Sequence, residues 1–542
     1  MKMIKYYAVA LLLSLGLVWA GRHGWLLIPS VWLSLSLFFI LLAYTSNYPK
    51  IFRKSATGSI PLWIKILLLP YLAGAQLYNA IVRHNDKVPA IQQITPDLFL
   101  ACRLFPTDIE MLEAEGVNAI VDVTAEFDGL NWSAEQEGLY YLNIPILDHY
   151  SPNETQIIHA INWIKAQHQL KNKVVIHCAL GRGRSFFTLC AYLLASQPDL
   201  TVREVIEQIQ SIRGTARLNK KQLKGLISIN NHVIKHAPQE LQLIVNPVSG
   251  SGKWYQYDNE IIGELTKEYQ LNFHFTEKDT DVTNLASSLL EPRSNATTFV
   301  ACGGDGTVTQ VASAIKNTPH TLGIMPTGTA NALAHVLLGF NSKVNPITEA
   351  CEALLAHQTV NMDTMTCNEQ TALLVVAVGL EERMIDHANR EQKNRLGQLA
   401  YIKGFYNALI AHDKLDMTLC VDEQPPEHVE CSSIAIANAA PFSTLLAQGG
   451  GPPDWQDGLL DITQLNYTDD TSERILSLAE LVTNSISQSN SANMSVQHHK
   501  AKAVHLSSET EFQYSIDGEI ESAKQLSIAV LPQSLSIICA DT

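Results

Sequence analysis

The sequence lacks paired cysteines, internal repeats and an overall basic charge. Its nine cysteines include no Cys-x-x-Cys pair, which argues against a disulfide framework or a zinc site and for a reducing compartment. The net charge of −15 does not favour a nucleic-acid partner. Charged residues are only 17% and hydrophobic residues 46%, so the 542-residue chain is not disordered and can form several cores.

Acidic residues are almost absent from the first 90 positions, which hold nine Lys and Arg residues and one acid. Two uncharged runs lie here, at 6–21 and 24–49, and a weaker apolar run at 66–82 contains Pro70. A hydrocarbon core about 30 Å thick needs about 20 helical residues, so the first run is short and the second is ample. We predict that residues 1–85 form a membrane anchor, with two spans plus an interfacial segment or a third span.

A cleaved signal peptide is the alternative for the N-terminus. Lys2 and Lys5 precede the first apolar run, and Val18-Trp19-Ala20 is an acceptable cleavage site. The second apolar run, which follows immediately, favours the anchor.

In the rest of the chain acids exceed bases by 23, and the pattern is that of soluble domains. From about residue 90, β-branched runs alternate with helical periodicity until the segment 236–240, which is the expected linker. A second alternation over 240–358 includes a predicted helix at 255–269 and predicts a doubly wound α/β unit with a mostly parallel sheet. Alternating strands dominate 359–542, which we predict to be an antiparallel β subdomain.

A buried-type strand at 174–176 runs through a glycine-bearing loop into a helix, with the sequence His177-Cys178-Ala179-Leu180-Gly181-Arg182-Gly183-Arg184-Ser185. The glycines allow the backbone N–H groups to converge at a helix N-terminus, which suits a phosphate. The helix dipole and Arg184 are expected to lower the pKa of Cys178, and Arg184 can hold two phosphate oxygens. Ser185 can donate a hydrogen bond to the sulfur.

Chemistry at this loop needs an acid for the departing alkoxide. Asp148 follows a predicted strand at 139–146 and should lie at the same end of the sheet, so it is the general-acid candidate. A plain turn carboxylate is the alternative reading of Asp148. His177 is expected to orient the loop, and Cys190, which has apolar helix neighbours, to be buried and inert.

The complete motif His177-Cys178…Gly181…Arg184-Ser185 resembles the cysteine-dependent dual-specificity phosphatases, over residues 90–236. The Gly-Arg-Gly-Arg loop and the upstream segment Val121-Asp122-Val123-Thr124-Ala125-Glu126 resemble the phosphatidylglycerophosphate phosphatase branch. The resemblance implies an α/β phosphatase domain acting on a lipid phosphate or a phosphoprotein. It also implies two steps, in which Cys178 forms a phosphocysteine and a water assisted by Asp148 hydrolyses it.

Three polar, glycine-bearing loops follow predicted strands in the second α/β region. They are Asn246-Pro247-Val248-Ser249-Gly250-Ser251-Gly252, Cys302-Gly303-Gly304-Asp305-Gly306-Thr307 and Pro326-Thr327-Gly328-Thr329-Ala330-Asn331. An open α/β sheet binds its ligand at the carboxyl ends of its strands, and glycines let the backbone approach phosphates. None of the loops is a Walker A or G-x-G-x-x-G motif.

Together with Arg395-Leu396-Gly397, Asp457-Gly458-Leu459-Leu460-Asp461 and Asp517-Gly518-Glu519, these loops resemble the diacylglycerol kinase catalytic family over about 240–541. The resemblance implies ATP as a substrate, with Mg²⁺. It implies that Asp305 acts beside the transferred phosphate and that Glu519 completes the site. It also implies nucleotide contacts from all three loops, by Asn246, Ser249, Gly303, Gly304, Gly306, Thr307, Thr327, Gly328 and Thr329.

Two positions depart from the kinase family pattern. Thr309-Gln310 stands where Asn-Glu is usual, and Ala332 stands where an acid is common. Two functions therefore stay open. One is a bifunctional phosphatase and lipid kinase, and the other is an active phosphatase whose kinase-like domain senses a nucleotide or a lipid.

Membrane lipids are the expected partners in both cases. Because ATP is required, we expect a multi-pass membrane protein with its catalytic domains on the cytoplasmic side. Two spans with Lys2 and Lys5 inside give this topology, and three spans with the N-terminus outside also give it. The sequence identifies no metal ligands and leaves the oligomeric state open.

Overall fold

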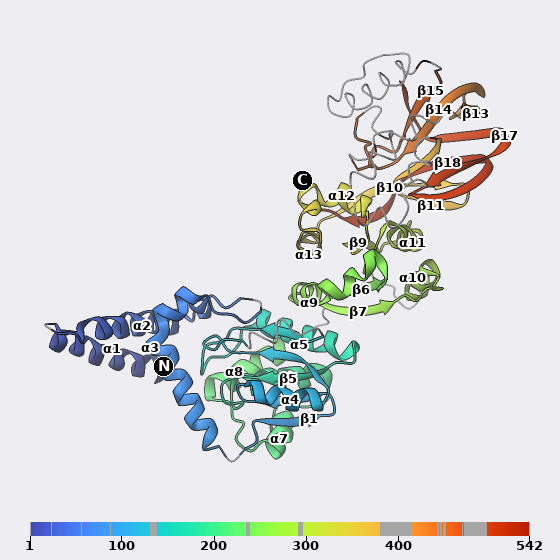
Figure 1. The fold of residues 1–542 in the computed structure, drawn as a ribbon. Helices are drawn as coiled ribbons and strands as arrows, with labels where there is room; N and C mark the ends of the chain where they lie inside the picture. Colours follow the sequence, from blue (N-terminus) through green and yellow to red (C-terminus); the bar gives the residue numbers. More distant parts are fainter. Residues whose placement is uncertain are drawn as a thin grey trace. The chain divides into compact units, whose positions relative to one another are not determined.

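A computed structural model describes residues 2–540, apart from residues 23, 56, 87, 130–137, 235–238, 291–295, 380–413, 442–443, 445–446, 448–450, 469 and 471–495. The chain divides into two compact units, Met1–Glu240 with Asn259–Asn272 and Leu241–Asp258 with Phe273–Thr542 (Figure 1). The predicted site residues all lie in the described part. Arg395-Leu396-Gly397 and residues 236–238 of the predicted linker lie outside it.

Three apolar helices begin the first unit: α1 (Lys2–Gly21), α2 (Leu27–Ser46) and, after the short 3₁₀ helix η1 (Pro49–Phe52), α3 (Leu62–His84). Each of the three is long and apolar enough to cross a membrane. Ser34 Oγ donates to Ser14 Oγ at 2.9 Å and joins α2 to α1, a polar contact typical of apolar helix pairs. Trp32 Nε1 donates to the Ile66 carbonyl at 2.9 Å and joins α2 to α3. The predicted apolar runs therefore form a connected set of helices.

A five-stranded sheet with surrounding helices follows in the first unit. Its elements are β1 (Ile91–Thr95), β2 (Leu98–Ala101), α4 (Pro106–Ala114), β3 (Val117–Asp122), β4 (Tyr140–Asn143), α5 (Glu154–Gln169), β5 (Lys173–His177), α6 (Arg184–Ser196), α7 (Val202–Ile212), α8 (Lys220–Ile229) and the π-helical turn η2 (Asn230–Ile234). The strand order is β1-β2-β5-β3-β4, and only β1 pairs antiparallel. Strands β3 and β5 are mostly buried, as the continuous apolar runs of a parallel sheet require.

Side-chain caps distinguish helices α5, α7 and α8 from helix α6. Asn153, Thr201 and Asn219 precede α5, α7 and α8, and each side chain accepts an N–H hydrogen bond in the first turn. Helix α6 begins after Gly183, which has no side chain to cap it. Its first N–H groups are therefore available to the loop between β5 and α6, where the sequence predicts the phosphate site.

Beyond residue 239, the described strands form one mixed sheet. The α/β part contains β6 (Gln239–Val245), η3 (Ser249–Ser251), α9 (Lys253–Leu265), β7 (Tyr269–Phe275), α10 (Val282–Leu290), β8 (Thr298–Gly303), α11 (Asp305–Ile315), β9 (Thr321–Pro326), α12 (Ala332–Leu338), η4 (Phe340–Lys343) and α13 (Pro346–Ala356). The β-rich part contains β10 (Thr359–Cys367), β11 (Gln370–Ala372), β12 (Val375–Gly379), β13 (Leu415–Val421), β14 (Glu427–Ala437), β15 (Leu460–Asn466), β16 (Val496–Ala501), β17 (Ala503–Ile516) and β18 (Glu519–Ile538).

The long strand β18 joins the two parts of this sheet. Strands β6, β8 and β9 pair in parallel, as predicted for the α/β region. Strand β18 pairs in parallel with β9, through Ser536 and Thr321, and antiparallel with β10 and β17. The β-rich region therefore continues the hydrogen-bonded sheet of the α/β region.

The predicted helix at 255–269 is wrong in its last turn. Helix α9 ends at Leu265, and Tyr269 begins strand β7. Residues 269–275 read Tyr-Gln-Leu-Asn-Phe-His-Phe, an alternation of apolar and polar residues that is typical of a strand.

The role of β18 as the shared strand predicts a large effect from one buried side chain. Ile537 is fully buried and pairs with Val360 of β10 and Leu322 of β9. We expect Ile537→Ala to destabilise the second unit by about 2–5 kcal/mol, because it leaves a cavity where three strands meet. Thermal unfolding in detergent measures the change. The matched control is Gln525→Ala, an exposed position of the same strand, and equal melting temperatures for the two variants would contradict the prediction.

Candidate active sites

The loop between β5 and α6 has its carbonyl oxygens held from outside. The Ala179 oxygen accepts a hydrogen bond from Arg103 N at 3.1 Å, and the Gly181 oxygen accepts one from Arg213 Nε at 3.0 Å. Gly181 has φ +63°, and a Cβ there would lie 2.8 Å from the Ala101 oxygen, so the position requires glycine. In a trans peptide the N–H points opposite to the carbonyl, so these contacts turn N–H groups toward the inside of the loop. The predicted phosphate-binding residues lie in this loop or the first turn of α6: Ala179, Leu180, Gly181, Arg182, Gly183 and Ser185.

Cys178 lies at the base of the loop with its thiol polarised. It is buried, and Ser185 Oγ donates to its Sγ at 3.2 Å. Burial is the largest influence and raises the pKa of Cys178, but the Arg184 charge and hydrogen bonds from Ser185 and the Leu180 N–H together outweigh it. The pKa of Cys178 is therefore lowered. Burial raises the pKa of Cys190, as expected for an inert core thiol.

Glu126 fixes Arg184 in place with a bidentate ion pair. Arg184 Nη1 donates to Glu126 Oε2 at 2.8 Å and Nη2 donates to Oε1 at 2.7 Å, and Nη1 also donates to the Ile146 carbonyl at 2.8 Å. Both side chains are buried. Arg184 Nε has no hydrogen-bond partner among the described residues, so a buried donor stays available for an anion. The sequence named Glu126 only within a family motif and did not predict this role.

Asp148 lies beside the same arginine. Its Oδ1 is 3.3 Å from Arg184 Nη2, and the carboxylate side chain is 43% exposed. The loop after β4 therefore brings the predicted acid to the guanidinium that serves the Cys178 loop. The structure brings Cys178, Arg184 and Asp148 together at the carboxyl ends of β4 and β5. The exposed carboxylate of Asp148 suits a general acid, and the buried thiol of Cys178 suits a nucleophile.

A buried ion pair that the sequence did not predict lies behind the loop. Lys54 Nζ is 2.5 Å from Asp122 Oδ2, and both side chains are 1% exposed. Asp122 Oδ1 is 3.8 Å from His177 Nε2. Burial raises the pKa of Asp122, but the Lys54 charge and hydrogen bonds outweigh it and hold this pKa well below its usual range. Burial lowers the pKa of His177, which fits the predicted orienting role of a neutral imidazole.

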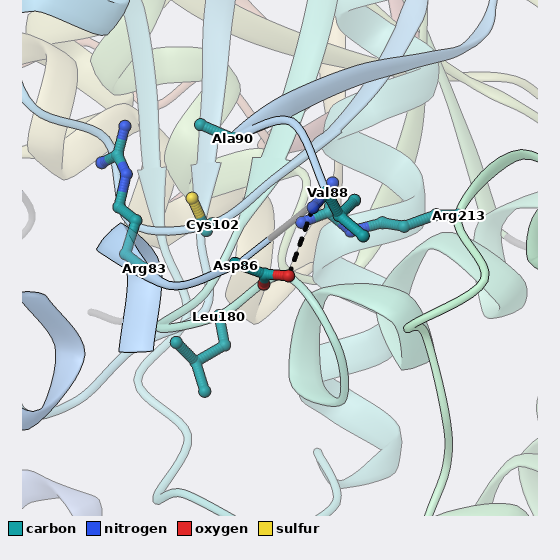
Figure 2. A pocket seen from close by; sticks show the side chains of 7 residues that line it. All are labelled: Arg83, Asp86, Val88, Ala90, Cys102, Leu180 and Arg213. Atoms are coloured by element: carbon teal, nitrogen blue, oxygen red, sulfur yellow. Dashed lines mark hydrogen bonds between the residues drawn. The ribbon is translucent and has the colours of Figure 1, made fainter. Parts of the chain in front are cut away.

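A cavity of about 210 Å³ borders the Cys178 loop. Figure 2 shows its lining, in which Leu180 of the loop lies near Asp86, and the dashed line marks the Val88 N–H donating to Asp86 Oδ1 at 3.3 Å. Cys178 is not among the residues that line it. The side chains that line it are Arg83, Asp86, Val88, Ala90, Cys102, Leu180 and Arg213.

In the second unit the three glycine-bearing loops meet at the carboxyl ends of β6, β8 and β9. Asn246 Nδ2 donates to Thr307 Oγ1 at 3.4 Å and joins the first loop to the second. A Cβ on Gly304 would lie 3.5 Å from both Ser249 Oγ and Gly328 Cα. A Cβ on Gly328 would clash with Gly304, so two glycine backbones pack against each other here. The predicted convergence of the loops is therefore present in the structure.

The other predicted nucleotide-binding residues lie in the same loops. Gly303 packs against the Thr307 side chain, and Gly306 and Thr329 are exposed. Thr327 is buried, and its Oγ1 has no hydrogen-bond partner among the described residues. Helix α11 begins after Gly304 with no side-chain cap, so its N-terminus is open like that of α6.

Two carboxylates approach the second loop from different elements. Asp305 begins α11, and its Oδ1 accepts the Leu333 N–H at 3.2 Å. Glu519 begins β18, and its Oε1 would lie 3.5 Å from a Cβ on Gly306. The structure therefore places Glu519 of the β-rich region beside the residue that follows Asp305.

The departure at Thr309 has a structural role. Thr309 Oγ1 donates to Asp517 Oδ2 at 3.1 Å, and Asp517 also accepts the backbone N–H groups of residues 373–375. Asp517 lies in the turn between β17 and β18, two residues before Glu519. The contact therefore fixes the turn that carries Glu519 against α11. The local sequence motifs did not predict this contact.

The carboxylates of the second site are candidate metal ligands. Among the described residues, no three His, Cys, Asp or Glu side chains are grouped to hold a metal ion. Asp305 and Glu519 offer oxygen ligands, and Mg²⁺ usually binds through one or two carboxylates together with substrate phosphates. The donor set therefore fits Mg²⁺ that arrives with a triphosphate.

Comparisons with known proteins match three stretches of the chain. Residues 98–232 match the family model for the catalytic domain of dual specificity phosphatases. Residues 240–367 match the diacylglycerol kinase catalytic domain. Residues 374–539 match the YegS C-terminal NAD kinase beta sandwich-like domain.

Individual relatives cover mainly one part of the chain. An uncharacterized protein of Synechocystis sp. is 34% identical over 304 residues, which is 54% of this chain and 69% of that protein. A diacylglycerol kinase of Staphylococcus saprophyticus is 25% identical over 283 residues, 51% of this chain and 88% of that protein.

Solved structures are similar to each of the two catalytic regions. A diacylglycerol kinase from Bacillus anthracis has a TM-score of 0.45 and 22% identity, and the match covers 56% of this chain and 99% of that one. PTPMT1 in complex with PI(5)P has a TM-score of 0.25 and 20% identity, and covers 26% of this chain and 96% of that one. The family matches show that one chain holds a dual specificity phosphatase catalytic domain and a diacylglycerol kinase catalytic domain.

Proposed function

We propose that the protein is a membrane-anchored bifunctional enzyme, a cysteine-dependent phosphomonoester phosphatase fused to an ATP-dependent lipid kinase. The observation that carries the proposal is that one chain holds two glycine-lined loops at open helix N-termini, one with a polarised thiol and the other beside two carboxylates. The three apolar helices support membrane attachment. We propose a multi-pass anchor of residues 1–85, with the catalytic domains on the cytoplasmic side, where ATP is available.

In the proposed phosphatase reaction, the Cys178 thiolate attacks phosphorus and the bond to the leaving oxygen breaks. Arg184 and the loop N–H groups hold the phosphate oxygens, and Asp148 donates its proton to the departing alkoxide. Ionised Asp148 then takes a proton from a water molecule, which attacks the phosphocysteine and releases phosphate. Ser185 stabilises the sulfur anion as it leaves.

In the proposed kinase reaction, the three loops bind ATP through backbone N–H groups and the side chains of Asn246, Ser249 and Thr307. Asp305 accepts the proton of a lipid hydroxyl such as that of diacylglycerol, and the oxygen attacks the γ-phosphorus. The bond between the γ-phosphorus and the β–γ bridging oxygen breaks, and ADP leaves. Glu519 holds the acceptor side of the site. Mg²⁺ bound with ATP supplies charge neutralisation for the phosphates.

The substrate class of the phosphatase is either a lipid phosphate or a phosphoprotein. The apolar helices and the kinase family favour lipid, since both active sites then meet their substrates in one membrane at high effective concentration. Comparing phosphate release from phosphatidylglycerophosphate in vesicles with release from a phosphotyrosine peptide decides between the two.

The rival function, a phosphatase with a kinase-like sensor, is favoured by the changes at Thr309 and Ala332. The hydrogen bond of Thr309 to Asp517 weakens this rival, because the substituted residue still holds the turn that carries Glu519. Separate measurements of ATP binding and ATP turnover distinguish the two functions, since a sensor binds without turnover.

The two activities should be separable by single substitutions. We expect Cys178→Ser to abolish phosphate release and leave lipid phosphorylation intact. We expect Asp305→Ala to lower lipid phosphorylation by about 10²-fold or more, the usual contribution of a general base, and leave phosphate release intact. Full-length protein with mixed lipid vesicles and labelled ATP measures both. Wild-type phosphorylation by Asp305→Ala, or wild-type phosphate release by Cys178→Ser, would refute that half of the proposal.

The lowered pKa of Cys178 predicts a specific pH dependence. Burial raises this pKa, but the Arg184 charge and the hydrogen bond from Ser185 outweigh it, so the thiolate persists at a pH below the usual range of a thiol. Ser185→Ala removes this donor and raises the pKa of Cys178, so alkylation by iodoacetamide at acidic pH should slow about tenfold, since a hydrogen bond to a charged group contributes about 1.5–3 kcal/mol. Mass spectrometry of the Cys178 peptide measures the rate. The control is Ser196→Ala at the far end of α6, which should react like wild type.

A further inference from the structure

Helix α3 reaches from the apolar helices to the Cys178 loop. Its first half packs against α2, where Ile64, Leu68 and Leu72 share a buried cluster with Ile40 and Tyr44. Near its other end, Asn79 is 2% exposed, and its Nδ2 donates to the carbonyl oxygen of Ala179 at 2.7 Å. One helix of the proposed anchor therefore contacts the backbone of the proposed phosphate loop directly.

The hydrogen bond from Asn79 to the Ala179 carbonyl oxygen also sets the direction of the next N–H group. The Ala179 carbonyl and the Leu180 N–H belong to one planar, trans peptide group and point in opposite directions. When Asn79 fixes the carbonyl on the outside of the loop, the Leu180 N–H is directed inward. This N–H hydrogen-bonds to Cys178 and lowers its pKa. The contact of Asn79 therefore acts on the thiol through a single peptide plane.

A second residue of α3 supports the same peptide. The Arg103 N–H is the other donor to the Ala179 oxygen, at 3.1 Å. Arg83 Nη1 donates to the Arg103 carbonyl at 2.6 Å, and Arg83 Nη2 donates to both carboxylate oxygens of Asp108, at 2.7 and 2.8 Å. The last two turns of α3 therefore supply one donor to the Ala179 oxygen, from Asn79, and hold the residue that supplies the other, Arg103.

The segment between α2 and α3 makes a third contact behind the loop. Lys54 of this segment forms the buried pair with Asp122 at the end of β3. Asp122 is the register partner of His177, which ends β5 and precedes Cys178. The connection between α2 and α3 thus contacts Asp122, which lies beside His177 at the start of the loop, and α3 contacts the loop itself at Ala179.

We propose that Asn79 is a positioning residue of the phosphatase and that helix α3 completes its active site. The proposal rests on the proposed phosphatase function and adds that the anchor supplies part of the machinery. Asn79 touches no substrate and acts through the Ala179–Leu180 peptide. The phosphatase is then competent only while α3 is packed against the loop.

The thiol also faces groups from other elements, which stay unchanged in the test. Arg184 comes from α6, Arg213 follows α7 and Cys102 follows β2, and each interacts electrostatically with Cys178. A change in thiol reactivity after substitution of Asn79 therefore reports the loop peptide, provided that these side chains are intact.

The experiment compares Asn79→Leu and Asn79→Asp in the full-length protein in detergent or nanodiscs. Leucine keeps the size but has no polar group, and an aspartate carboxylate keeps the shape but lacks the amide donor. We expect about tenfold slower alkylation of Cys178 by iodoacetamide at acidic pH, and about tenfold lower kcat for phosphate release, since small misplacements of a reacting group have effects of this size or larger. Gln76→Leu, an exposed position of α3, is the matched control and should behave as wild type.

The outcomes separate this inference from the proposed function. Alkylation needs no turnover, so an inactive wild type would refute the phosphatase while the alkylation rates still test Asn79. Wild-type alkylation rates and kcat in either folded variant would overturn the inference. A lower kcat with an unchanged alkylation profile would also overturn it, because a merely structural role predicts that result. Circular dichroism identifies which variants fold, and the aspartate variant serves if the leucine variant does not.

Discussion

Both sites depend on helix N-termini that lie next to the end of a buried strand and carry no side-chain cap. Helix α6 begins after Gly183 and α11 begins after Gly304, and neither has a side-chain cap. The first N–H groups of a helix need acceptors, and those left open at the end of a buried strand form an anion site. Helices α5, α7 and α8 are capped by their own side chains. The uncapped N-termini of α6 and α11 thus lie where phosphate chemistry is proposed.

Buried charges around the first site are arranged in pairs that fix geometry. Glu126 holds Arg184, and Lys54 holds Asp122. A single buried charge is strongly destabilising, whereas a pair with good hydrogen bonds is tolerated and constrains both side chains. Arg184 is therefore oriented before any phosphate arrives, which reduces the entropy lost on binding.

Sequence predicted the parts of each site whose signals are local. Cys178, Arg184 and the three glycine-bearing loops lie next to their own strands and helices, so short motifs were sufficient. The contacts of Asn79 with Ala179, of Lys54 with Asp122 and of Thr309 with Asp517 join residues 100, 68 and 208 positions apart. Nothing in an apolar run marks one asparagine as a donor to a distant carbonyl. The helix predicted at 255–269 is too long for a different reason. The alternation of apolar and polar residues in strand β7 overlaps the end of the helical pattern.

The apolar helices are a structural support for the first sheet and not a flexible tether. A tether raises local concentration and leaves the fold of the attached domain independent. Here the segment after α2 inserts Lys54 among buried groups, and Asp128 accepts the Ile60 N–H at 2.9 Å and pairs with Lys65 at 2.8 Å. Without this segment Asp122 would be a buried, unpaired charge, which is more destabilising than the pair is stabilising. The apolar helices and the first sheet are therefore joined by buried contacts, and the distance between these helices and the Cys178 loop is set by packing.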